Sequence, residues 1–241
     1  MTPRVDGEVH TFTEQGLYDG LFIMWDEESG TYWNHFTGEG LYGPLAGTKL
    51  PVQNMLHSTV GQTLALDPDA LIAISDHERA NRRRGRGGRG RRGGGGGGLM
   101  SRVGRGLSQF FLGTIDELDE RRETMDVGLG VWMDDDARYY SQEDVMEQGR
   151  ALLDTFGGRD LLIYYDPASF TLGAHFVEAD RVWWEDDTLH LSSGHYILDG
   201  VMRKEDGNPL RAERPLQVFT RWYGFALTFP DTEIYEAPEG G

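Results

Sequence analysis

The side chains that could bind or transform a ligand are seven histidines, many carboxylates and a dense set of aromatic residues, with no cysteine. The lack of cysteine excludes disulfides, thiolate metal sites and a cysteine nucleophile. The histidines show neither the HxH nor the HExxH spacing of a metal site, no GxSxG motif occurs, and Gly128-Leu129-Gly130 lacks the third glycine of a dinucleotide loop. The sequence therefore predicts no catalytic residue, no metal site and no cofactor.

Residues 16–50 are the best candidate for a binding surface, because they combine tryptophan, tyrosine and glycine with turn-forming residues. An indole N–H, an amide and a carboxylate on an aromatic floor could bind a small polar ligand. The alternative is a packed aromatic corner whose polar tips are already hydrogen-bonded. The predicted ligand-binding residues are Tyr18, Asp19, Trp33, Asn34, His35 and Glu39.

Residues 82–98 contain only seven arginines and ten glycines, a composition that predicts disorder. The tract resembles the RGG segments of RNA-binding proteins, so it is the one part of the chain that could bind nucleic acid. Because it lacks interleaved aromatic residues, a flexible linker or an arm that contacts the protein's own acidic surface fits equally well. The arginines of the RNA-binding alternative are Arg82, Arg83, Arg84, Arg86, Arg89, Arg91 and Arg92.

The rest of the chain is strongly acidic. The net charge is −17, and setting aside the ten arginines at 79–105 leaves 13 basic against 40 acidic residues, a balance of −27. Such a surface repels nucleic acid and anionic membranes. No apolar run approaches the roughly 20 residues of a membrane span. The first ten residues have no apolar region of a secretory signal, so the sequence leaves the localisation unknown.

Short apolar runs separated by turn-forming residues predict a β-rich α+β fold with a few short helices. Strands are predicted at 21–25, 31–36, 71–74, 128–133, 161–165, 174–177, 181–184, 189–192 and 233–235. Helices are predicted at 59–66, 108–123 and 141–156, with a further helix-like segment at 216–228.

An internal echo indicates two diverged copies of one β-rich unit. Residues 50–72 are echoed by residues 214–234, and residues 16–20 by residues 197–200. The predicted organisation is a partial first unit at 1–76, a disordered Arg/Gly-rich linker at 77–106, a helix at 107–125, a second unit at 126–237 and a tail at 238–241.

The segments 16–50, 157–176 and 219–235 together resemble the bacterial family called domain of unknown function 3179. Members of that family resemble two tandem copies of such a unit and are commonly exported or lipid-anchored. Their first copy usually carries a Cys-Pro-Leu-Cys-Gly segment upstream of the part that begins this chain. The equivalent place in the second copy here reads Tyr165-Asp166-Pro167-Ala168-Ser169-Phe170, so no thiol-based role carries over. The resemblance implies the back half of a first unit followed by a full second unit.

The predicted function is that of a non-enzymatic binding or accessory domain, because the aromatic segment lacks a nucleophile, a metal set or a cofactor loop. One alternative is a redox or hydrolytic enzyme whose catalytic half lies upstream of Met1. The other is RNA binding through the arginines of the Arg/Gly tract. The sequence identifies no further partner.

Overall fold

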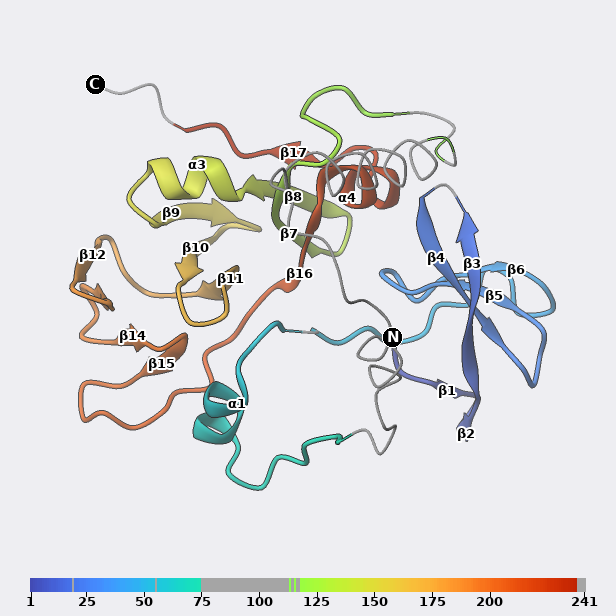
Figure 1. Ribbon diagram of the computed structural model, residues 1–241, viewed down its shortest axis with the longest axis horizontal. Helices are drawn as coiled ribbons and strands as arrows, with labels where there is room; N and C mark the ends of the chain where they lie inside the picture. Colours follow the sequence, from blue (N-terminus) through green and yellow to red (C-terminus); the bar gives the residue numbers. More distant parts are fainter. Residues whose placement is uncertain (19, 55, 75–112, 114, 116–117, 238–241) are drawn as a thin grey trace, which may run out of the picture.

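The computed structural model of the chain describes residues 1–18, 20–54, 56–74, 113, 115 and 118–237 (Figure 1). It is rich in β-strands and has a few short helices, which confirms the predicted fold class at that level. Among the described residues the longest helices have seven residues, and none is long and apolar enough to cross a membrane. The Arg/Gly tract and the tail at 238–241 lie outside the described residues.

A twisted antiparallel sheet occupies the N-terminal part. Its strands, in spatial order, are β3 (Phe12–Tyr18), β4 (Leu21–Asp26), β5 (Tyr32–Asn34) and β6 (Gly40–Tyr42), preceded by a small hairpin of β1 (Arg4–Val5) and β2 (Glu8–Val9). Trp33, Val5 and Leu50 form a buried cluster on which Phe12 and Met24 pack. This core is small, so much of the sheet depends on other contacts for its stability.

A second sheet is built around the hairpin of β7 and β8, and helix α4 covers it. Its elements are β16 (Leu216–Arg221), β7 (Val127–Met133), β8 (Asp136–Ser141) and β17 (Glu233–Ile234), with α4 (Trp222–Thr228) directly after β16. Trp222 and Phe225 of the helix pack on Tyr139 of the sheet. A Cβ atom at Gly130 would come within 2.1 Å of the Phe225 ring, so a glycine is required under the helix.

Two further antiparallel sheets complete the fold. One contains β9 (Ala151–Phe156), β10 (Arg159–Asp166) and β11 (Thr171–Phe176), and the other β12 (Val182–Glu185), β13 (Thr188–Leu191), β14 (Tyr196–Leu198) and β15 (Val201–Arg203). Strand β10 lies between two apolar clusters: Leu161 and Ile163 belong to one, Leu162 and Tyr164 to the other. Burial on both faces explains why this strand is a continuous apolar run in the sequence.

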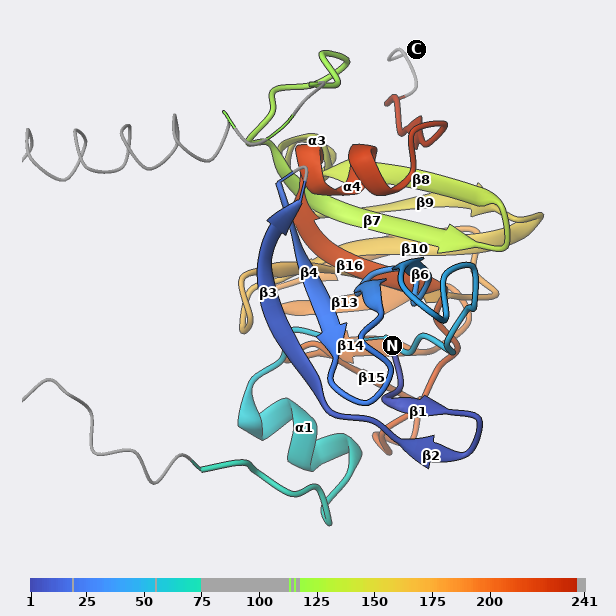
Figure 2. The ribbon, with the colours of Figure 1, turned by 90° about the vertical axis from the view of Figure 1, so that its right-hand side faces the viewer.

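Helix α1 (Val60–Leu66) connects the N-terminal part to the sheets that follow. The helix begins with a capping box formed by Thr59 and Gln62, and its bounds agree with the helix predicted at 59–66. Nearby, the side-chain amide of Asn54 donates to the carbonyl of Pro215 and its oxygen accepts from the amide of Gln217. Helices α3 (Gln142–Glu147) and α4 lie at the opposite end of the molecule from α1 (Figure 2).

Several predicted elements differ in the structure. The helix predicted at 141–156 ends with α3, because Gly149 and Arg150 adopt φ angles of 82° and 72° that no right-handed helix contains, and the chain continues as β9. The segment 216–228 is a strand for its first half and a helix for its second. Residues 71–74 form no strand, and Leu71 is 98% exposed. Residues 118–125, where a helix is predicted, form turns and bends instead.

Candidate functional site

One six-residue turn, with the sequence Asp-x-x-Ser-x-Thr, occurs twice. Residues 26–31 connect β4 to β5, and residues 166–171 connect β10 to β11. In each turn the serine hydroxyl donates a hydrogen bond to the aspartate and lies 2.8 Å from the threonine hydroxyl. In each, the fifth residue has a positive φ, and its amide donates to the aspartate carbonyl at 2.9 Å. The two turns therefore share one local hydrogen-bond pattern.

The aspartate of the first turn is fully buried and saturated with donors. Asp26 Oδ1 accepts from His10 Nδ1 at 2.9 Å and from the Ser29 amide at 2.8 Å, while Oδ2 accepts from the Ser29 hydroxyl and, at 3.1 Å, from Trp33 Nε1. A carboxylate offers about four acceptor positions, so these four bonds fill it. Burial alone would raise the pKa of Asp26, but the hydrogen bonds from Ser29, Trp33 and His10 lower it below its ordinary value.

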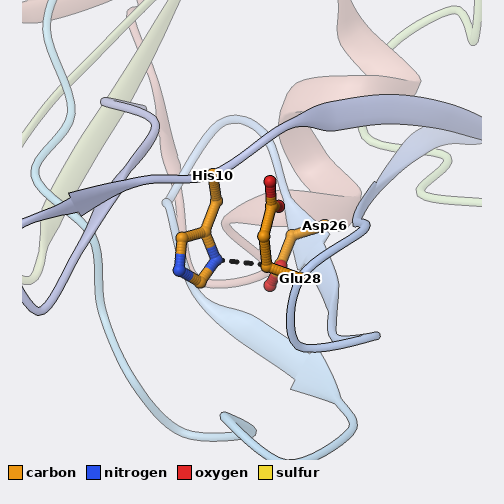
Figure 3. Close-up of side chains that lie close together, drawn as sticks. All are labelled: His10, Asp26 and Glu28. Atoms are coloured by element: carbon orange, nitrogen blue, oxygen red, sulfur yellow. Dashed lines mark hydrogen bonds and ion pairs between the residues drawn. The ribbon is translucent and has the colours of Figure 1, made fainter.

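His10, Asp26 and Glu28 lie close enough together to suggest a metal site (Figure 3). One potential ligand atom from each lies within 4.8 Å of the other two. However, the Glu28 carboxylate accepts from the amide and the hydroxyl of Thr11, and every acceptor position of Asp26 is taken. A cation would have to displace one of these donors. We therefore interpret the group as a hydrogen-bonded cluster that fastens the β4–β5 turn to the segment between β2 and β3.

The aspartate of the second turn is buried but not saturated. Asp166 is 6% exposed; its Oδ2 accepts from Gln62 Nε2 at 2.6 Å and from the Ser169 hydroxyl, and its Oδ1 accepts from the Ala168 amide at 3.0 Å. Among the described residues no fourth donor reaches it. Asp166 lines a cavity of about 220 Å³ between α1 and the β10–β11 hairpin. One of the roughly four acceptor positions of this carboxylate therefore has no donor among the described residues.

The residue seven positions after each aspartate explains the difference. That residue is Trp33 in the first hairpin, and its indole both fills the space beside Asp26 and donates to it. In the second hairpin it is Gly173, which lines the cavity. The strand registers agree, since Trp33 pairs with Met24 and Gly173 pairs with Tyr164, two residues before each aspartate. A Cβ atom at Gly173 would lie 3.1 Å from the Tyr164 ring, so in the second hairpin this ring stands over the glycine, and both residues line the cavity.

Tyr164 and Arg214 form another part of the cavity wall. Burial raises the pKa of Tyr164 above its ordinary value, whereas the charge of Arg214 acts to lower it. His175 stacks on Tyr164, with ring centroids 5.9 Å apart. Burial lowers the pKa of His175 well below its ordinary value, and the charge of Arg214 acts in the same direction, so this imidazole is neutral at pH 7. Neither ring nitrogen has a well-formed hydrogen bond to a described residue, although backbone groups of Ala212 and Glu213 lie nearby.

The predicted ligand-binding residues do not gather at one surface. Trp33 is inside the core of the N-terminal sheet, where its indole N–H is already bound. Tyr18 is 70% exposed and lines a shallow groove with Tyr32 and Tyr42. Asp19 lies outside the described residues.

The other three predicted residues lie in and after β5. The side-chain oxygen of Asn34 accepts from the amides of Phe36 and Thr37, which is a turn-forming role. His35 Nδ1 lies 2.9 Å from the Phe22 carbonyl, and burial lowers the pKa of this histidine. Glu39 is exposed. Ligand binding by this set stays a prediction, and the seven arginines of the RNA-binding alternative lie outside the described residues.

Sequence reasoning missed Asp166, Gln62 and Arg214 as site residues. Asp166 and Gln62 are 104 positions apart, so no local pattern joins them. One signal was available, namely the recurrence of Asp-x-x-Ser-x-Thr with tryptophan after the first copy and glycine after the second. That recurrence marks two equivalent turns of which only one is followed by a space-filling side chain.

No curated protein and no solved structure matches this chain. A family model does match, and it covers residues 1–208, which is most of the sequence and includes both Asp-x-x-Ser-x-Thr turns as well as α1. The family is described as a protein of unknown function, so the match assigns no ligand and no reaction. The chain belongs to this family, DUF3179.

Proposed function

We propose that this protein is a non-enzymatic binding or accessory protein, and that its ligand site is the cavity between α1 and the β10–β11 hairpin. The observation that carries the proposal is the open acceptor position of Asp166. A buried carboxylate is energetically costly unless hydrogen-bond donors fill its acceptor positions. At Asp26 the protein's own side chains and backbone supply all of these donors, whereas at Asp166 they supply three. The cavity has room for roughly seven water molecules, which favours a ligand smaller than the occupants of ordinary drug-sized pockets.

The hydroxyl groups around the cavity support binding over catalysis. Ser169 is bonded to Asp166 and Thr171, and Ser58 to Thr63. Among the described residues that line the cavity, no hydroxyl has a histidine as hydrogen-bond partner, so none is activated as a nucleophile. The polar groups are instead fixed in place, as a preformed binding site requires.

We further propose that the chain contains two diverged copies of one unit, with the cavity at the contact between them. Helices α1 and α4 have the same length and stand at matching places in the sequence echo. The contacts are reciprocal: a Cβ at Gly20, in the β3–β4 turn, would lie 3.3 Å from Tyr223 of α4, and one at Gly200, in the β14–β15 turn, 2.2 Å from Gln62 of α1. Reciprocal packing is what two copies related by approximate symmetry would produce.

The test introduces the tryptophan of the first hairpin at the equivalent position of the second. The double variant Tyr164→Met with Gly173→Trp recreates the Met24–Trp33 pair beside Asp166. We expect a screen of small polar compounds to give some that raise the melting temperature of the wild type, and we expect the variant to lose that response because the indole occupies the site. Phe170→Trp is the matched control, since it adds an indole to the same turn at an exposed position outside the cavity.

Thr63→Trp, at a half-buried position of α1 that lines the cavity, is a second filling variant if the double variant does not fold. The proposal fails if no compound stabilises the wild type, or if the compounds that do so stabilise both filled variants equally.

A further inference from the structure

The cavity contains a guanidinium group that lacks a carboxylate partner. Arg214 is half-buried, and its Nη1 donates to the Ala174 carbonyl at 3.1 Å. It is the one arginine or lysine among the described residues that line the cavity, and no ion pair joins it to a described carboxylate. In a chain of net charge −17, an unpaired and half-buried arginine is unusual, because acidic partners are abundant.

The carboxylates of the cavity do not neutralise this arginine. Asp67 lies 3.5 Å from Arg211, and the bonds to Asp166 all come from neutral donors. The neutral Tyr164 side chain is a hydrogen-bond partner of Arg214, and His175, which stacks on Tyr164, adds no charge at pH 7. The cavity therefore presents one cationic donor and, separately, one anionic acceptor with an open position.

A molecule that satisfies both groups needs an anion for Arg214 and a hydrogen-bond donor for Asp166. A carboxylate suits the planar guanidinium, which can donate two parallel N–H bonds to it. A hydroxyl or amino group elsewhere on the same molecule can donate to Asp166. The small volume limits the ligand to a few carbon atoms between these two groups.

We propose that the cavity binds a small carboxylic acid that also carries a hydroxyl or amino group, with its carboxylate on Arg214 and its donor on Asp166. This assignment rests on the proposed function and goes beyond it by naming the ligand class.

The experiment uses four probes of similar size: propionate, L-lactate, L-alanine and isopropylamine. Binding to the full chain is measured by calorimetry and by saturation-transfer NMR at pH 7. Propionate has the carboxylate alone, lactate and alanine add a donor, and isopropylamine has the donor alone. We expect lactate or alanine to bind about tenfold more tightly than propionate, and isopropylamine to bind least.

Two variants assign the ends of the ligand. Arg214→Gln should weaken every carboxylate probe by about tenfold or more, whereas Arg181→Gln, which removes an arginine that stacks on Trp183 and does not line the cavity, should not. Asp166→Asn should remove the preference for lactate or alanine over propionate. Comparison of lactate with alanine distinguishes a hydroxy acid from an amino acid.

The assignment is overturned if isopropylamine binds as tightly as alanine, if Arg214→Gln leaves the affinity of the carboxylates unchanged, or if none of the carboxylate probes binds. In the last case the compound screen separates the two proposals. Screen compounds of another class that are lost on filling the cavity leave the proposed function standing, while their absence removes both.

Discussion

The two Asp-x-x-Ser-x-Thr turns have the same local bonds and opposite surroundings. In the first, Asp26 has four donors and is sealed by an indole; in the second, Asp166 has three donors among the described residues and faces a cavity. The donors of Asp26 all come from residues 10–33, whereas Asp166 is held by Gln62, a residue 104 positions away. The first turn is thus complete by itself, and the second depends on the packing of α1.

This difference shows that a turn sequence determines the geometry of its own residues. The residues packed around the turn determine whether its carboxylate is fully hydrogen-bonded. The same buried aspartate stabilises the fold where a tryptophan donates to it, and becomes a candidate ligand contact where a glycine provides no such donor. The difference can be measured, because substitutions can make each hairpin resemble the other.

The largest expected effect comes from opening the first hairpin. Trp33→Ala removes a fully buried indole, its edge-to-face contact with Phe12 and the donor to Asp26. We expect a loss of about 3–5 kcal/mol in the free energy of unfolding, measured by urea titration with circular dichroism. The small core of this sheet leaves few contacts that could compensate.

The control is Leu172→Ala, which truncates a buried residue of the other hairpin that borders the open cavity. If Trp33→Ala costs no more than the loss of this smaller side chain, the indole does not seal the first hairpin and the comparison fails.

The two aspartates should respond differently to neutralisation. Asp26→Asn replaces an oxygen that accepts two bonds by an NH₂ group facing donors, so we expect a loss of about 2–4 kcal/mol. Asp166→Asn has an open position toward which the NH₂ group can turn, so we expect about 1–2 kcal/mol. Parallel urea titrations at pH 7 measure the difference. Equal losses in the two variants would contradict the assignment of a saturated and an unsaturated carboxylate.

Much of the fold follows from patterns that act over a few residues. The apolar run at 161–165 predicted β10 because burial on both faces demands it, and the helix predicted at 59–66 matches α1. The helix predicted at 141–156 was wrong after Gln148, because the left-handed residues Gly149 and Arg150 turn the chain so that residues 151–156 can pair with β10. That pairing is tertiary, and helical periodicity carries no information about it.

The candidate site was less accessible to sequence reasoning for the same reason. Aromatic residues around Trp33 suggested a surface, yet an indole whose N–H meets a buried carboxylate is more stable inside the core. The cavity beside Asp166 depends on the position of α1, whose Gln62 reaches Asp166 from 104 residues away, and no local pattern reports that contact. The absence of a side chain at Gly173 is informative only after the two turns have been compared.

The wall of the open hairpin should show a pH effect that arises from His175. The pKa of His175 in the folded protein lies well below its ordinary value of 6.5. Below pH 6.5 the unfolded chain therefore binds a proton that the folded protein does not. The contribution of His175 to stability is complete above pH 6.5 and falls by about 1.4 kcal/mol per pH unit below it.

His175→Phe keeps a ring stacked on Tyr164 and removes this titration. We expect the loss of unfolding free energy between pH 6.5 and pH 5.5 to be smaller in this variant by about 1 kcal/mol, less than the full change of about 1.4 kcal/mol because the histidine of the unfolded chain is only half protonated at pH 6.5. An unaltered slope in His175→Phe would show that the imidazole is protonated in the folded state.

The smallest expected effect concerns the fifth residue of each turn, where the backbone is left-handed in both hairpins. The first hairpin has Gly30 at φ 72°, which costs nothing for glycine, and the second has Phe170 at φ 58°, with a side chain that is 71% exposed. Phe170→Gly should therefore stabilise the protein by about 0.5–1 kcal/mol, because it relieves the steric cost of a Cβ atom in this region by more than the added entropy of the unfolded chain. Gly30→Ala should destabilise it by a similar amount, and urea titration of both variants measures the pair. Opposite signs would show that the two turns share one backbone conformation with the same steric cost, so that the residue seven positions after each aspartate, and not the turn itself, decides which aspartate is open. Equal signs would mean that the surroundings of Phe170 favour its side chain, and the second turn would then be held by contacts that the first does not have.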